Sequence, residues 1–300
     1  MSVQPRGEVY DIGYRRYAGP REGRSRARFA LWTNGVRTAL GLGRGTGAKI
    51  LPILLFASTM VPAAVFVIVA SFAEDFGVSD VADVPGHFDY FGVVSILILL
   101  FSAIMAPELL CADRRSQVLQ LYLVRPLTAI DYVAGRWLAF FTIILALVYS
   151  GQVVMFLGFT FAAQEPLDYI RENWLDIPRF LAAGAVVAVF VTTIPLAVAG
   201  FTARRFYATG FVIGLFVIAA TVPGRLIEAA TGEWTRWVSL LDILTLPTHL
   251  VGIIFNEGDP GNPILREMNR LHDAIPILWY IALTVGSAAL LLRRYQRESR

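Results

Sequence analysis

Six long apolar segments, separated by shorter polar segments, dominate the hydropathy pattern of this 300-residue chain. A helix needs about 20 consecutive apolar residues to cross a bilayer. The third segment is longer than the others, so we expect it to tilt or to project from the bilayer. The pattern predicts an all-α polytopic membrane protein with six transmembrane helices. The predicted spans are residues 50–73, 90–107, 133–162, 179–201, 207–223 and 274–292.

Composition supports the same class of protein. Hydrophobic residues make up 56% of the chain and charged residues 16%, compared with about 25% charged residues in soluble domains. Residues 1–49 are polar and contain no apolar core of a signal peptide, so we expect them to form a cytoplasmic tail and an interfacial helix. Residues 50–300 are expected to form the transmembrane domain.

Residues 26–40 carry apolar side chains at helical spacing, with Phe29, Trp32 and Val36 among them and arginines between. This pattern predicts an amphipathic helix in the plane of the membrane interface, with Trp32 toward the bilayer. The preceding tail mixes arginines with tyrosines. Such a mixture also occurs in proteins that bind nucleic acid, but beside a span we expect it to contact the lipid bilayer and no nucleic acid.

The distribution of basic residues predicts the orientation of the spans. Six spans place both chain ends on one side, which would carry 20 Arg and Lys residues, compared with six on the other side. Basic residues are enriched in cytoplasmic loops. We therefore expect both termini and the loop of residues 108–136 in the cytoplasm. The preference for Arg over Lys suggests a GC-rich genome, and we expect the protein in a bacterial cell membrane.

The loop of residues 108–136 is polar but patterned. Its arginines and aspartates exclude it from the bilayer centre, where each costs roughly 2.5–3.5 kcal/mol. Apolar residues recur at helical spacing from Val118 to Tyr122, and Pro126 ends the pattern because proline lacks the N–H that a continuing helix needs. A short amphipathic helix between two spans is typical of an element that docks into a groove on a soluble partner.

Residues 113–136 read DRRSQVLQLYLVRPLTAIDYVAGR. This stretch resembles the cytoplasmic coupling loop of ABC-2 type permeases, the membrane subunits of a type V-like class of ABC exporter. The chain departs from the family at Gln117, Gln120 and Arg136, where Gly, Glu and Lys are common, and the two glutamines would alter the contact with the ATPase. The matching residues are Asp113, Arg115, Leu119, Leu121, Pro126, Tyr132, Gly135 and Arg136.

The resemblance implies two partners and a set of coupling residues. One partner is a separate nucleotide-binding ATPase subunit, which would hold ATP and Mg²⁺. The other is a second membrane subunit, identical or different, with the transport pathway between the two and lined partly by the second and fifth spans. The implied ATPase-coupling residues are Asp113, Arg114, Arg115, Leu119, Leu121, Tyr122, Arg125 and Pro126, with Arg204 and Arg205 in a second cytoplasmic turn.

Gly210 and Gly214 form a small-x-x-x-small pattern on the fifth span, which favours close contact with another helix. The partner helix would belong either to the second membrane subunit or to the same chain.

Residues 237–255 form a further apolar segment, which contains Asp242, Pro247 and His249. A seventh span here would place the arginine-rich C-terminus outside, against the preference for basic residues in the cytoplasm. The segment is therefore predicted to be an outer re-entrant or interfacial helical pair, bent at Pro247, as the resemblance also implies. His249 would either sense pH and gate export, or serve as a hydrogen-bonded interfacial polar group.

Several kinds of chemistry find no support in the sequence. Apart from Arg136 and Arg179 at the starts of two spans, no Asp, Glu, Lys, Arg or His falls inside the six predicted spans, where Gln152 is the main strongly polar side chain, and ion-coupled transporters usually need such residues. The glycine-rich stretch 41–49 has Ala48 where a phosphate loop needs Gly before its Lys. The single cysteine, Cys111, is interpreted as a small buried residue and leaves no cysteine metal cluster.

These observations predict a permease subunit of an ATP-driven exporter, moving an amphipathic or lipid-like cargo. The chain itself is expected to be no enzyme and to hold no cofactor or metal. A non-transport membrane scaffold or accessory protein, whose basic loop binds another cytoplasmic partner, is the alternative. A secondary transporter is disfavoured by the uncharged spans.

Overall fold

The computed structural model describes Gly19 and residues 23–43, 45–76, 85–116, 127–230, 232–258 and 261–298, and within these residues the chain is helical and contains no strand. Six of its helices are long and apolar enough to cross a membrane. These six helices are α2 (Gly47–Asp75), α3 (His87–Arg115), α5 (Ala129–Ala162), α7 (Asp176–Ala199), α8 (Arg205–Ala229) and α12 (Ala274–Glu298).

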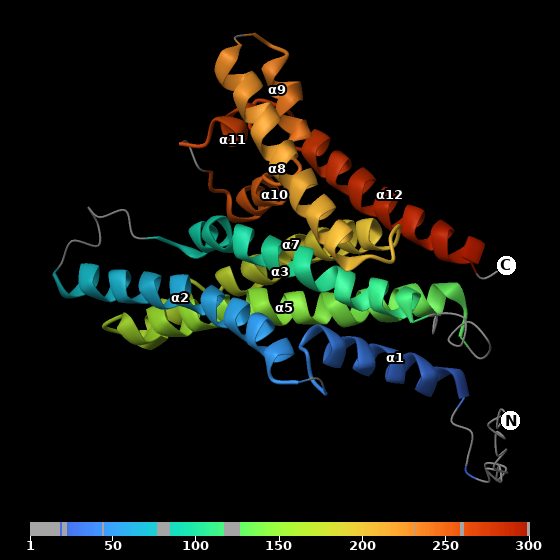
Figure 1. The fold of residues 1–300 in the computed structure, drawn as a ribbon. Helices are drawn as coiled ribbons and strands as arrows, with labels where there is room; N and C mark the ends of the chain where they lie inside the picture. Colours follow the sequence, from blue (N-terminus) through green and yellow to red (C-terminus); the bar gives the residue numbers. More distant parts are fainter. Residues whose placement is uncertain are drawn as a thin grey trace, which may run out of the picture.

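Shorter helices precede, follow or connect the long ones. They are α1 (Gly23–Ala39), α6 (Pro166–Glu172), α9 (Thr235–Val238), the 3₁₀ helix η1 (Ser239–Leu241), α10 (Leu246–Phe255) and α11 (Pro263–Met268). The first runs along α5, and the last four lie between α8 and α12 (Figure 1).

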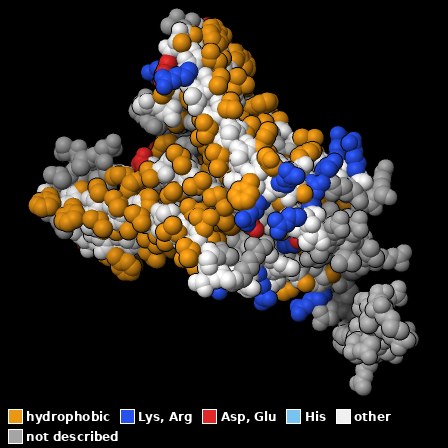
Figure 2. Space-filling model, viewed as in Figure 1, with side chains coloured by type: hydrophobic (Ala, Val, Ile, Leu, Met, Phe, Trp, Pro, Cys, Tyr) orange, Lys and Arg blue, Asp and Glu red, His pale blue; other side chains and the backbone are white. Residues whose placement is uncertain are grey.

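Helix α7 is the centre of the bundle, because it packs against α3, α5, α8, α10 and α12. Within the chain, 67% of its apolar part is buried, compared with 17% for α2 and 22% each for α8 and α12. Large apolar side chains therefore cover much of the outer surface, as Figure 2 shows. Helices that are apolar on all sides suit hydrocarbon surroundings, and the protein is embedded in a membrane.

One end of the bundle carries most of the basic side chains, and we call it the basic end. Here α3 and α7 end, and α5 and α8 begin. Figure 1 places the start of α1 and the end of α12 at this end as well. Arg and Lys side chains gather beside it in Figure 2. The polar ends of the long helices thus meet where the sequence predicts the cytoplasm.

Several helices extend further than predicted, among them α12, which continues to Glu298. The second span was expected to end at Pro107, but α3 continues to Arg115. The fifth was expected to end at Pro223, but α8 continues to Ala229. Proline within a helix removes one hydrogen bond, and packing against neighbouring helices can offset that loss. Pro107 and Pro223 are both buried against such neighbours.

The segment before the last long helix contains a sharp bend of 108° between residues 235–241 and 246–255. The prediction placed this bend at Pro247, which is wrong: Pro247 lies in the first turn of α10, where a missing N–H costs nothing. The break occurs at residues 242–245. There, Asp242 accepts hydrogen bonds from the backbone N–H groups of Leu244 and Thr245.

Counted as one span, the bent pair would be a seventh crossing. The last part of α8 lies against α11, since Gly224 approaches Ile264, whereas the last turns of α12 lie at the basic end, where Tyr295 contacts Tyr132. The end of α8 and the start of α12 therefore both lie at the end of the bundle opposite the basic end.

Candidate functional site

A cluster around Asp113 joins the end of α3 to the start of α5. The Asp113 carboxylate accepts a hydrogen bond from the Tyr132 hydroxyl at 2.8 Å. It also forms an ion pair with Arg136, whose Nη2 lies 2.5 Å from the same carboxylate. Arg136 is only 2% exposed, and its guanidinium lies 5.8 Å from the centre of the Tyr132 ring. The Tyr295 ring of α12 packs on Tyr132 at 5.3 Å. Charge-assisted hydrogen bonds of this kind fix α3 relative to α5, and the ring contact adds α12 to the cluster.

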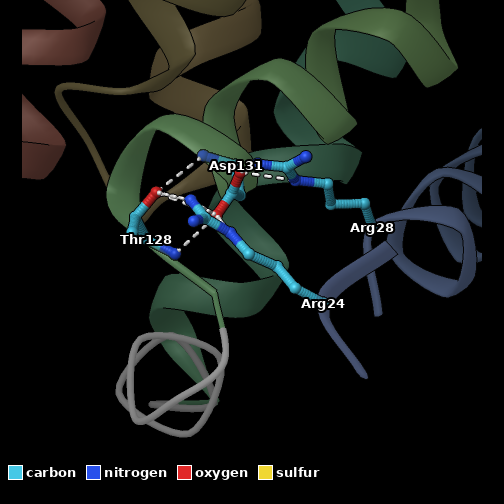
Figure 3. A network of polar contacts seen from close by, with 4 residues as sticks. All are labelled: Arg24, Arg28, Thr128 and Asp131. Atoms are coloured by element: carbon cyan, nitrogen blue, oxygen red, sulfur yellow. Dashed lines mark hydrogen bonds and ion pairs between the residues drawn. The ribbon is translucent and has the colours of Figure 1, made fainter. Parts of the chain in front are cut away.

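A second cluster fastens α1 to the first turn of α5, and Figure 3 shows it from close by. Thr128 caps α5, with a reciprocal hydrogen bond between its side chain and Asp131. The buried Asp131 carboxylate also accepts ion pairs from Arg24 and Arg28 of α1, each at 2.6 Å. The two arginines lie one helical turn apart, so both reach the same carboxylate.

Small residues let α1 approach α5 closely. The buried face of α1 is Leu31, Gly35 and Ala39. A Cβ atom on Gly35 would lie 2.5 Å from Ala139 Cβ, and one on Gly135 would lie 2.7 Å from Leu31 Cδ2. This pair of glycines is the reason that the two helices fit together.

Most of the apolar face predicted for α1 lies outside this close contact, although Val36 packs against the hydrophobic core. Phe29 is 53% exposed, and Trp32 and Val36 are half-buried. Trp32 donates a hydrogen bond to Thr142 at 3.3 Å. The prediction for this helix rested on its large apolar side chains, whereas the close contact with α5 is made by its small residues.

A third group of contacts fixes the turn between α7 and α8. Arg114 donates to the carbonyl oxygen of Gly200, and Arg205 forms an ion pair with Glu108 at 2.5 Å. Cys111 is buried, as predicted, with its thiol 3.2 Å from the carbonyl oxygen of Thr202. The end of α3 is thus bound to the start of α8.

The structure brings together the predicted coupling residues that it describes. Asp113, Arg114 and Arg115 lie at the end of α3, and Arg204 and Arg205 lie beside them at the start of α8. Asp113 and Arg114 are half-buried in contacts within the chain, whereas Arg115 and Arg204 are exposed. The other predicted coupling residues lie outside the described residues: Leu119, Leu121, Tyr122, Arg125 and Pro126.

Sequence reasoning missed the role of Asp131, Arg24 and Arg28. One signal was available, because Thr128 and Asp131 form the Thr-x-x-Asp pattern of a capping box, which marks a helix start. The spacing of Arg24 and Arg28 was also visible as one helical turn. Nothing in the sequence indicated which carboxylate they would bind.

Polar side chains are also buried at the opposite end. Gln152, the polar residue predicted in the third span, binds His87: its Oε1 lies 2.5 Å from His87 Nδ1, and its Nε2 donates to the His87 backbone carbonyl. His87 is the buried first residue of α3. His249 is buried in α10, and its Nε2 has no hydrogen-bond partner in the described part of the chain.

No cluster of three or more His, Cys, Asp or Glu side chains with metal-site geometry occurs in the described ranges. No protein-family model matches the chain, and the search of characterised proteins gives no match. Fold and site together define a helical membrane protein with six long apolar helices, whose basic end is held together by ion pairs and hydrogen bonds between helices.

Proposed function

We propose that the chain is the permease subunit of an ABC-2 type exporter, driven by ATP that a separate subunit hydrolyses. The observation that carries this proposal is the cluster at the basic end. Asp113, Tyr132 and Arg136 belong to the stretch that resembles the coupling loop, and Tyr132 and Arg136 follow Asp113 by 19 and 23 residues in the sequence. In the folded chain the three side chains touch, and Gly135 holds α1 beside them.

The contacts of this cluster suit the transmission of force. Residues 117–126 connect α3 to α5, and the Asp113–Arg136 ion pair joins the two helices next to that connection. The Asp131 cluster extends the rigid unit to α1, and the Arg205–Glu108 ion pair extends it to α8. A partner that pulls on the loop would therefore move several helices together, as rigid-body switching between two states requires.

The proposal assigns roles to the remaining elements. The basic end is cytoplasmic, α1 is the interfacial helix, and the bent pair of α9, η1 and α10 is the outer re-entrant element. Gly210 and Gly214 lie on α8, and a Cβ atom added to either would meet nothing within 4 Å among the described residues. Packing within this part of the chain therefore does not explain the glycine pair, which favours a contact with a second membrane subunit.

The test is affinity purification of the tagged full-length chain from its native membranes. The expected result is co-purification of a protein with Walker nucleotide-binding motifs. Replacing exposed Arg115 together with Tyr122 should abolish that association while membrane insertion persists. Arg225→Gln, an exposed arginine at the other end of α8, is the matched control and should leave the association unchanged.

Two outcomes would contradict the proposal. One is cargo efflux that survives the Arg115 and Tyr122 replacements. The other is a cytoplasmic partner without a nucleotide-binding motif, which would instead support the membrane scaffold or accessory protein.

A further inference from the structure

An apolar groove runs along the bundle from the α7–α8 turn toward η1. Helix α7 packs against both α8 and α12, and residues of all three helices line the groove. Its volume is about 680 Å³, within the range of roughly 300–1,000 Å³ of small-molecule sites. Side chains that line it include Ala197, Phe201, Phe211, Ala219, Leu283 and Leu290.

A basic cleft adjoins this groove at the basic end. The cleft has a volume of about 450 Å³, and Tyr207 lines both hollows. Arg115, Arg204 and Arg205 line the cleft together with Glu108. Because Glu108 pairs with Arg205, the cleft keeps the positive charges of Arg115 and Arg204.

Arg204 lies next to the junction of groove and cleft. Its guanidinium is 5.6 Å from the centre of the Tyr207 ring, and the side chain is exposed. Figure 2 shows basic side chains next to a continuous hydrophobic surface at this end of the molecule. The apolar groove therefore ends at the basic cleft, on one surface of the molecule.

We propose that the groove and the cleft bind one anionic phospholipid, with an acyl chain along the groove and the phosphate near Arg204 and Arg115. An acyl chain gains little hydrophobic free energy by leaving the bilayer for the groove, since lipid tails are as apolar as leucine. Selectivity must then come from the headgroup, and basic residues at the membrane surface attract anionic lipids. The inference requires only the membrane-embedded fold and is independent of the exporter function.

The test uses the full-length protein, purified in detergent and freed of lipid. Native mass spectrometry and thermal denaturation would compare phosphatidylglycerol, phosphatidylcholine with the same acyl chains, and inorganic phosphate. We expect phosphatidylglycerol to bind most tightly and to raise the Tm most. Inorganic phosphate should leave the Tm unchanged, because it cannot fill the groove.

Single substitutions test the contributions of the groove and of the cleft separately. Arg204→Gln should weaken phosphatidylglycerol binding roughly five-fold, the factor that corresponds to about 1 kcal/mol per basic residue. Arg225→Gln is the matched control, since Arg225 lies on the same helix, pairs with Glu228 and lines neither hollow. Ala219→Trp should block the groove and weaken binding while all the arginines remain.

Four results would overturn the proposal. Equal binding of the two phospholipids would show that the site does not select the headgroup. Equal effects of Arg204→Gln and Arg225→Gln on phosphatidylglycerol binding would show that the cleft does not bind the phosphate. A Tm increase with inorganic phosphate as large as that with phosphatidylglycerol would indicate a free-anion site. A change of oligomeric mass in Ala219→Trp, with lipid binding intact, would make the groove an interface between copies of this chain.

Discussion

Asp113 of α3 and the buried Arg136 of α5 form an ion pair, with 2.5 Å between Oδ2 and Nη2. Their side chains are 14% and 2% exposed. The pair joins the two helices that flank residues 117–126, and the Tyr132 hydroxyl binds the same carboxylate oxygen. A buried ion pair contributes little net stability compared with an apolar replacement, but the loss of one partner leaves a costly buried charge.

This asymmetry predicts that Asp113→Ala destabilises the protein by about 3–5 kcal/mol, because Arg136 stays buried without this carboxylate. Thermal or denaturant unfolding in detergent would measure the loss. Removing both charges, in Asp113→Ala combined with Arg136→Met, should restore part of the stability. A double variant that is less stable than Asp113→Ala alone would show that Arg136 does not depend on this partner.

The packing of α1 on α5 predicts a second effect. Gly35→Ala places a Cβ atom 2.5 Å from Ala139 Cβ, so the helices must separate, at a cost of about 1–3 kcal/mol. Gly286→Ala is the matched control, since a Cβ there meets nothing within 4 Å and alanine favours a helix interior by roughly 0.5–1 kcal/mol. The free energy of unfolding should fall in Gly35→Ala and rise in Gly286→Ala, each compared with the unmodified protein. Equal stabilities would mean that α1 is not packed as described.

A glycine of α5 predicts a larger loss of stability on replacement by alanine. A Cβ atom on Gly151 of α5 would lie 1.8 Å from the Tyr90 hydroxyl oxygen, and Tyr90 is fully buried against α2 with its hydroxyl bonded to the Thr59 carbonyl. Gly151→Ala should therefore cost more stability than Gly35→Ala. Tyr90→Phe combined with Gly151→Ala should recover part of the loss in the same unfolding assay. No recovery would indicate that the Tyr90 ring, whose Cζ and Cε2 would lie 2.3 and 2.8 Å from the new Cβ, causes the clash as well as the hydroxyl.

Most of the fold is readable from hydrophobic spacing, because each long helix presents an apolar stretch of bilayer length. The ends of the helices are less readable. Pro107 and Pro223 look like stops, but buried neighbours hold the helices together beyond them. The bend before α10 follows Asp242 rather than Pro247, because the Asp242 carboxylate accepts hydrogen bonds from two backbone N–H groups of the break between the helices.

The site was less predictable than the fold. The charged residues of the 108–136 loop were identified, but their pairing depends on which helices touch. Asp131 looked like one more loop charge until α1 brought Arg24 and Arg28 to it. Pairings between residues far apart in the sequence, such as Arg24 and Asp131 at a separation of 107 positions, leave no local pattern.

The Asp131 cluster predicts that α1 can be released selectively. Asp131→Ala removes the shared partner of both arginines and half of the capping box, so α1 should separate from α5 while the six long helices stay folded. Hydrogen exchange should increase in residues 23–39 and little in α7. Arg28→Ala alone should have a smaller effect, since exposed ion pairs contribute about 0–1 kcal/mol. Unchanged exchange in Asp131→Ala would mean that the glycine contacts alone hold α1.

The orientation of the basic end is the prediction on which the exporter proposal depends most directly. The chain has a single cysteine, which is buried, so a Cys111→Ala background allows new cysteines to report on each end. Ser116→Cys, exposed at the end of α3, should react with a membrane-impermeant maleimide only after the membrane is opened. Asp168→Cys in α6, at the opposite end, should react in intact cells. Labelling of Ser116→Cys from outside would place the loop outside the cell, where no ATPase subunit can reach it.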